Sequence, residues 1–156
     1  GRTPNADLPL SHGTEMNLRI PALIPDDYLP DVHNRLMLYK RSASVKTEEE
    51  LKELQVEMID RFGLLPQPAK NLIRQSSLRI RAEGLGVVKV DAGRDWLKLE
   101  FGNNTTVDPL RLVQKVQQAP DQYRLGGANT FSVRLKDDTT DGKLDAISAA
   151  LADLAA

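Results

Sequence analysis

The residues best suited to chemistry in this sequence are four carboxylates that fall in one row of a predicted helix. Within residues 47–66, TEEELKELQVEMIDRFGLLP, acids recur at steps of three, four and three residues, namely Glu50, Glu53, Glu57 and Asp60. Neighbouring like charges on one helix face repel by roughly 0.2–0.5 kcal/mol per pair. Such a row can take part in acid–base catalysis, or it can accept hydrogen bonds from arginine side chains.

Catalysis is the weaker of these two interpretations. Glu57 and Asp60 are one helical turn apart and are the closest candidates for a catalytic pair. A catalytic pair needs two different environments, or positions on opposite sides of a substrate. Two neighbours on a polar helix face have neither, so the sequence favours a binding role and predicts no catalytic residue.

The other candidate sites carry weaker signals. His12 lies in a polar N-terminal segment, and His33 has only Asp31 nearby, which is typical of a surface histidine rather than a general base. The segment DDTTD, residues 137–141, lacks the glycine and the bidentate glutamate of a calcium loop and is better explained as a helix N-terminus. We expect no metal and no cofactor in this part of the protein.

A basic run in the third predicted helix supports an alternative function. It consists of Lys70, Arg74, Arg79 and Arg81. These side chains can contact phosphates, although no aromatic residues are interleaved with them. A nucleic-acid-binding accessory module using helix 70–81 therefore remains open. So does a small-molecule enzyme or sensor, which would need a deep apolar pocket with convergent polar groups.

Composition narrows the class of protein. The chain has 156 residues, of which 40% are apolar and 28% charged, with a formal net charge of −1. This balance argues against a general nucleic-acid or membrane-surface binder. The absence of cysteine excludes disulfides, thiolate zinc sites and cysteine nucleophiles. No apolar run reaches the ~18 residues of a membrane span. We therefore expect a cytoplasmic domain without membrane contact.

Charge alternates in sign along the chain. Residues 31–46 are basic, residues 47–62 acidic and residues 70–81 basic, and the C-terminal tail is acidic again. Either neighbouring helices attract one another into place, or one charged face meets a partner. The sequence alone leaves both interpretations open.

Hydrophobic periodicity divides the chain into elements. Residues 1–14 are predicted to be a flexible lead-in. Residues 15–156 are predicted to form one domain with a mainly helical part (15–84) and a part with hairpins and helices (85–156). The helical part begins with a strand over residues 15–20. A proline-rich connector then leads to the first helix.

Three helices are predicted in the first part. The first covers residues 31–44 with Asp31 as N-cap, the second residues 47–62 with Thr47 as N-cap, and the third residues 66–83. The buried stripe predicted for the first comprises Val32, Leu36 and Tyr39, with Leu38 and Ala43. The seam predicted for the second comprises Leu51, Leu54, Met58 and Phe62. In the third, Arg74 and Arg81 are expected to face solvent.

The period changes from helical to alternating after Gly86. A hairpin is predicted over residues 87–101, a short helix over residues 108–118, a second hairpin over residues 122–136 and a last helix over residues 141–156. The fold class is therefore α+β with an antiparallel sheet: an N-terminal strand and three-helix region, then antiparallel β-hairpins with a short helix between them, and a C-terminal helix.

Three segments of the helical part are similar to a known family. They are IPDDYLPD (24–31), RLMLYKR (35–41) and IDRFGLLPQPAKNL (59–72), and they occur in the family's order. From about residue 17 to residue 81 the chain resembles the C-terminal domain of bacterial transcription-repair coupling factors, the Mfd family. The later hairpins match only in general pattern.

The resemblance implies a regulatory module at the end of a large DNA translocase. Members of the family use ATP and Mg to move on DNA, displace stalled RNA polymerase and recruit the excision-repair protein UvrA. The C-terminal domain is understood to clamp the UvrB-like N-terminal domain of the same protein, cover its UvrA-binding surface and restrain the motor. The expected partners are therefore that UvrB-like domain and, through the full-length protein, UvrA, RNA polymerase and DNA.

The resemblance also implies site residues. In the family, acids of the helix that ends in DRFG meet basic residues of the UvrB-like domain, and the matching positions here are Glu57 and Asp60. Glu53 extends the row as a peripheral contact. Arg61 is a further candidate, although it can instead interact with the end of its own helix. Glu50 is expected to be committed to the helix cap.

Overall fold

The computed structural model describes residues 13–127 and 129–156. These residues form two compact units: the first comprises Ile20–Ile80, and the second joins residues 13–19 to Arg81–Ala156. Helix α4 (Gln67–Gly84) contributes to both. Within the described ranges, the helices are too short or too polar to cross a membrane.

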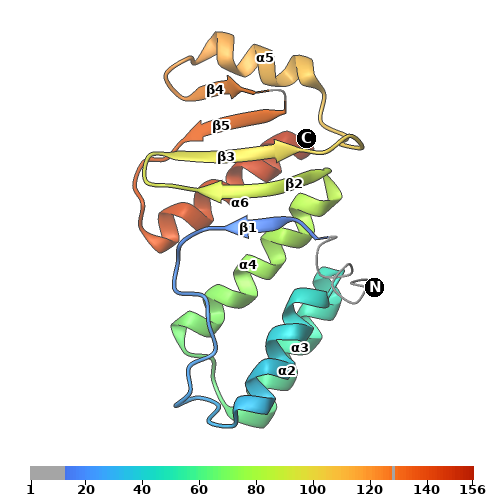
Figure 1. Ribbon diagram of the computed structural model, residues 1–156, viewed down its shortest axis with the longest axis vertical. Coiled ribbons are helices and arrows are strands. Elements are labelled where there is room, and N and C mark those ends of the chain that lie inside the picture. The colour runs from blue at the N-terminus through green and yellow to red at the C-terminus, as the bar shows by residue number, and fades with distance from the viewer. Residues whose placement is uncertain (1–12, 128) are drawn as a thin grey trace, which may run out of the picture. The chain divides into compact units, whose positions relative to one another are not determined.

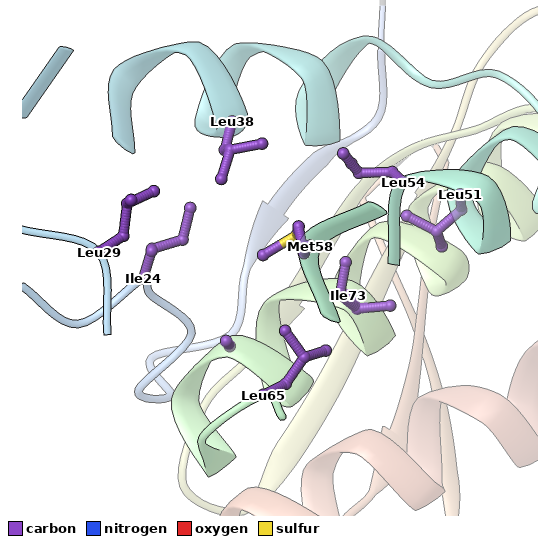
Figure 2. Close-up of a cluster of buried hydrophobic side chains, with 9 residues drawn as sticks. Ile24, Leu29, Leu38, Leu51, Leu54, Met58, Leu65 and Ile73 are labelled. Atoms are coloured by element: carbon purple, nitrogen blue, oxygen red, sulfur yellow. The ribbon is translucent and has the colours of Figure 1, made fainter. Parts of the chain in front are cut away.

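The first unit consists of the connector, helix α2 (Val32–Ser44), helix α3 (Glu48–Phe62) and most of α4. Helices α2 and α3 lie side by side (Figure 1). Figure 2 shows that their inner side chains meet those of the connector and of α4. This buried cluster comprises Ile24, Leu29, Leu38, Leu51, Leu54, Met58, Leu65, Ala69 and Ile73. The seam predicted for α3 is confirmed, with Phe62 packed at its edge.

The predicted ends of α2 and α3 are also confirmed. The carboxylate of Asp31 accepts from the N–H of His33, and the hydroxyl of Thr47 accepts from the N–H of Glu50. Gly63 follows α3 with a φ of 97° and a ψ of −176°, a combination that is almost restricted to glycine. Local sequence therefore determines where both helices start and where α3 stops.

The buried face predicted for α2 is wrong in part, because Leu38 is buried and Tyr39 packs against the core, but Val32, Leu36 and Ala43 are exposed. Val32 and Leu36 are 59% and 57% exposed, whereas Leu38 and Ser42 are buried. Ser42 donates its hydroxyl to the carbonyl of Tyr39, which removes the cost of burying it. A small serine whose hydroxyl is hydrogen-bonded can occupy a buried position, so the buried residues of α2 are Leu38 and Ser42 rather than those of its most apolar stripe.

The expectation for α4 is wrong at one arginine. Arg81 is half-buried, and its guanidinium donates to the hydroxyl and the carbonyl of Ser148 at 2.9 and 3.0 Å. Its position in the second unit, where α4 meets the last helix, explains the difference. Arg74 is half-buried.

The second unit is built on a five-stranded sheet of order β1-β2-β3-β5-β4. The strands are β1 (Glu15–Asn17), β2 (Val87–Ala92), β3 (Trp96–Phe101), β4 (Tyr123–Gly126) and β5 (Thr130–Arg134). Both predicted hairpins are confirmed as antiparallel pairs. The sheet as a whole is mixed, because β1 pairs in parallel with β2. The whole helical region lies between these two strands, and such a long crossover permits a parallel pair.

Helix α6 (Thr140–Ala155) lies across one face of this sheet (Figure 1). The four side chains predicted for its apolar face, Leu144, Ile147, Leu151 and Leu154, are all buried. Helix α5 (Pro109–Gln118) begins after its predicted cap and contacts β4. On the opposite sheet face, Lys98 and Glu100 of β3 are exposed. The described residues thus have the predicted α+β order.

The predicted lead-in is described only at its end, since residues 1–12, with His12, lie outside the described residues. Thr14 is buried, and its hydroxyl donates to the carbonyl of Val87 at 2.5 Å. Its N–H donates to the carboxylate of Glu83 at 3.1 Å. The last residue of the predicted lead-in is therefore part of the second unit.

Candidate docking surface

The four acids of the row lie along α3, and the structure gives them different environments. The N–H of Glu50 donates to the hydroxyl of Thr47 at 3.1 Å, and the Glu50 carboxylate accepts from the N–H of Lys46 at 3.2 Å. This is a capping box whose return bond reaches one residue further back than usual. The prediction that Glu50 serves the helix start is confirmed.

Glu57 is held by two arginines. Arg41 of α2 donates from Nη1 to Oε2 at 2.7 Å and from Nη2 to Oε1 at 3.0 Å, and Arg61 donates to Oε2 at 3.2 Å. The hydrogen bonds from Arg41, and secondarily the contact with Arg61, hold the pKa of Glu57 below its usual value. The Arg41 and Glu57 side chains are 44% and 37% exposed, so solvent weakens the pair, which contributes about 0.2–1 kcal/mol.

Asp60 and Glu53 are the acids of the row that remain available. Both are exposed, and neither makes an ion pair or a side-chain hydrogen bond with another residue in 13–127 or 129–156. Val56 lies among them and is 50% exposed. These side chains border a shallow depression of about 570 Å³, lined by Glu49, Lys52, Glu53, Val56, Glu57, Asp60 and Arg61. All four predicted site residues therefore share one surface.

The C-terminal end of α3 is anchored by the connector. The hydroxyl of Tyr28 lies 2.8 Å from the carbonyl oxygen of Gly63 and 3.2 Å from that of Met58. Because the hydroxyl has a single proton, these two carbonyls share it as acceptors. Burial raises the pKa of Tyr28, so it remains a neutral donor. Its ring packs edge-on against Phe62, with 6.1 Å between centroids, and the guanidinium of Arg61 lies 4.8 Å from the centre of the Phe62 ring. The last turn, which carries Asp60 and Arg61, is thereby held in place.

The N-terminal end of α3 is anchored by α4. The guanidinium of Arg79 donates to the carbonyls of Ser42 and Val45 at 3.2 and 2.8 Å, which holds the end of α2 and the following link. The hydroxyl of Ser77 donates to the carboxylate of Glu48 at 2.8 Å. With both ends fixed and one side in the core, α3 presents its acids on a rigid support.

The same contacts weaken the nucleic-acid alternative. Arg79 is directed at backbone carbonyls of the first unit, and Arg81 is bound to Ser148 in the second. Of the basic run, Lys70 is exposed. A guanidinium committed to internal acceptors must give them up before it can meet a phosphate, so helix α4 does not present the continuous basic face that its sequence suggests.

The remaining candidates have structural roles. The carboxylate of Asp31 caps α2 and does not face the imidazole of His33. Asp137 accepts from the N–H and the hydroxyl of Thr139, and these bonds lower its pKa and stabilise the start of α6. Trp96 lies at the start of β3 beneath the guanidinium of Arg124, 3.9 Å from the ring centre. Among the described residues, no three histidine or acidic side chains could hold a metal ion together.

The second unit contains a groove of about 680 Å³ beside α6, β4 and β5. Phe131 and Ala146 are among the residues that line it. Two charged residues of its lining, Lys115 and Asp153, form an ion pair. Since these two charges pair with each other, neither is left unpaired for a ligand.

Sequence reasoning missed two residues of the surface. Arg41 was visible only as part of a basic first helix beside an acidic second one, a pattern that correctly suggested attraction between the helices. Val56 lies outside the apolar seam of α3, so the helical periodicity assigned no role to this residue. Together the acids and Val56 can accept a basic group next to a small apolar contact.

Comparisons of this chain with family models and with known sequences agree with one another. The family model described as TRCF domain matches residues 18–112. The transcription-repair-coupling factor of Escherichia coli (strain K12) is 46% identical over 127 residues, which cover 81% of this chain and 11% of the relative. That of Haemophilus influenzae is 42% identical over 144 residues, covering 92% of this chain and 12% of the relative. The chain thus spans about a tenth of the length of these relatives.

A solved structure has the same fold. The crystal structure of a C-terminal domain of transcription-repair coupling factor aligns over 91% of this chain and 93% of its own, with a TM-score of 0.66. The two sequences are 22% identical, so this likeness concerns the fold.

Proposed function

This chain belongs to the family of TRCF domains, the C-terminal domains of bacterial transcription-repair coupling factors, and on that premise we propose that it is a non-catalytic regulatory domain that docks through α3 on a UvrB-like N-terminal domain of the same protein. Docking covers the UvrA-binding surface of that domain and restrains the motor. Glu57 and Asp60 are the principal contacts, with Glu53 and Arg61 at the margin.

The observation that carries this proposal is the state of Asp60. It is an exposed carboxylate without an internal ion pair among the described residues, on a helix that is anchored at both ends. A carboxylate held in this way can accept a charge-assisted, bidentate hydrogen bond from an arginine without first losing a partner. Val56, half-exposed beside it, adds a small apolar contact.

The polarity of the surface suits a contact that must open. A polar, charged interface forms quickly and weakens as salt rises, whereas a large apolar interface would stay closed. Release then requires only that another event, such as polymerase engagement, favours the open state.

For the whole protein we propose the activity implied by its relatives' names, transcription-repair coupling. In this scheme the parent is an ATP- and Mg-dependent DNA translocase that displaces stalled RNA polymerase and recruits UvrA. The present domain needs no cofactor, because its part is to block a surface.

Charge reversal in the full-length protein tests the proposal. The double variant Glu57→Lys, Asp60→Lys removes two carboxylates and places like charges against the basic partner. We expect higher basal ATPase activity and tighter UvrA binding, while the domain keeps its fold. The matched control reverses Asp121 and Asp138, two exposed acids of the second unit, and produces the same change in net charge.

Unchanged ATPase activity and UvrA affinity in the double variant, or equal effects of the control variant, would contradict docking through α3. A gel-shift assay separates the alternative function. Meaningful duplex affinity of the isolated chain that disappears in Lys70→Ala would favour nucleic-acid binding instead.

A further inference from the structure

Glu57, one of the two acids proposed to meet the partner, is already occupied within its own domain. A carboxylate offers about four acceptor positions, two on each oxygen. Arg41 takes one position on each oxygen, and Arg61 takes a second position on Oε2. One position on Oε1 therefore remains, which is too little for the bidentate bond that a partner arginine would form best.

We propose that Arg41 competes with the basic group of the partner for Glu57 and thereby lowers the affinity of docking. This inference rests on the proposed function and assigns a specific affinity-setting role to a residue of the other helix. Docking then exchanges one arginine for another at Glu57, whereas Asp60 supplies a new ion pair.

The fold places Arg41 in this position. It lies in the last turn of α2, where a cation interacts favourably with the helix end. The buried Leu38 of α2 and Met58 of α3 belong to one core cluster, which sets the two helices side by side. The pair is therefore a product of tertiary packing, and it is present before any partner arrives.

Charge acts in the same direction as occupancy. Arg41 and Arg61 place two positive groups within hydrogen-bonding distance of Glu57, and these repel an approaching basic group. Arg41 is 44% exposed, so it can leave Glu57 without being stranded in an apolar environment. Competition therefore weakens docking without preventing it.

A positioning role for Arg41 would have the opposite sign. If Arg41 served to hold Glu57 ready for the partner, its removal would leave a mobile carboxylate and weaken docking. Under competition, its removal frees one acceptor position on each oxygen of Glu57, although Arg61 still binds Oε2, and makes the surface more negative, so docking becomes tighter. The direction of one affinity change separates the two explanations.

The experiment measures binding of this chain in trans. The receptor is the full-length parent carrying Glu57→Lys and Asp60→Lys, whose own docking surface is disabled. We expect the chain with Arg41→Ala to bind about two- to fivefold more tightly than the wild-type chain, the factor that an exposed ion pair supplies. Arg41→Lys keeps the positive charge but loses the planar guanidinium that can bind both oxygens, so its affinity should lie between those of the other two chains.

The matched control is Lys40→Ala, which removes the same charge one residue away, from an exposed side chain that makes no ion pair within the described ranges. It should change affinity less than Arg41→Ala does. Suppose that the wild-type chain binds and that Asp60→Ala weakens this binding. Unchanged or weaker binding of Arg41→Ala then overturns this inference and leaves the proposed function standing. No binding of the wild-type chain overturns the proposed function and this inference with it.

Discussion

Replacing Leu54 by alanine tests the orientation of α3, on which the docking surface depends. Leu54 is 2% exposed and lies in the cluster formed by α2, α3, α4 and the connector (Figure 2). If α3 is oriented as described, this side chain fills the core, and the acids lie on the side of the helix that faces away from the core. If the helix were rotated, Leu54 would be a surface residue.

The expected cost follows from burial. Truncating a fully buried leucine loses the transfer free energy of three carbons and leaves a cavity, which together cost about 2–5 kcal/mol. For a chain of this length, each kcal/mol corresponds to roughly 2–4 °C in Tm. A loss of about 3 kcal/mol should therefore lower Tm by roughly 6–12 °C.

Two signals should follow unfolding, because one reports both units and the other reports the second unit alone. Far-UV circular dichroism is dominated by the helices, of which α2, α3 and most of α4 lie in the first unit and α5 and α6 in the second. The single tryptophan, Trp96, lies in β3 of the second unit, so its fluorescence reports the unfolding of that unit. If Leu54→Ala shifts only the circular dichroism transition, the units unfold independently. If both transitions shift together, they unfold as one.

Val56→Ala is the matched control on the same helix. Val56 is 50% exposed, and alanine has the higher helix propensity, so the change in unfolding free energy should stay within about 0.5 kcal/mol. A loss below about 0.5 kcal/mol for Leu54→Ala, or a larger loss for Val56→Ala, would refute the orientation and with it the docking surface.

Two further predictions concern backbone and charge. Gly86 has a φ of 75°, and a Cβ there would lie 2.4 Å from the Cα of Thr105, so Gly86→Ala should lower the free energy of unfolding measured in urea by about 2 kcal/mol or more. In the control Gly84→Ala the new Cβ meets open space, so this change should be neutral or slightly stabilising. Equal effects of the two substitutions would contradict this prediction. The pKa of Glu57 is lowered on folding, so the stability from its pair with Arg41 is present above the unfolded-state pKa and is lost as pH falls through the folded-state pKa. The stability difference between wild type and Arg41→Ala should accordingly be about 0.2–1 kcal/mol at neutral pH and approach zero in acid, and a difference that grows in acid would reverse the assigned sign.

The accuracy of the sequence predictions follows the distance over which each interaction acts. The caps at Asp31 and Thr47 were predicted because the capping side chain and the backbone group that it binds are two or three residues apart. The seam of α3 followed from one uninterrupted helical period. The face of α2 was predicted wrongly at Val32 and Leu36, because two candidate stripes overlap there and the buried one includes the polar Ser42.

The candidate site shows the same division. That Glu53, Glu57, Asp60 and Arg61 share one side of a helix is a consequence of spacing, and the structure confirms that they line one depression. Which acid remains available could not be read from spacing, because Arg41, which binds both oxygens of Glu57, is sixteen residues away on another helix. Their role as interdomain contacts remains a prediction.

The sequence by itself determined the order of the elements, the helix ends and the row of acids, since each depends on residues within a few positions of one another. Only the tertiary structure decided that Arg41 reaches Glu57, that Arg81 binds Ser148 and that β1 runs parallel to β2. Those features depend on the packing of distant segments, which side-chain volume and the satisfaction of buried polar groups select together. For this protein, packing separates an occupied carboxylate from an available one on the same helix.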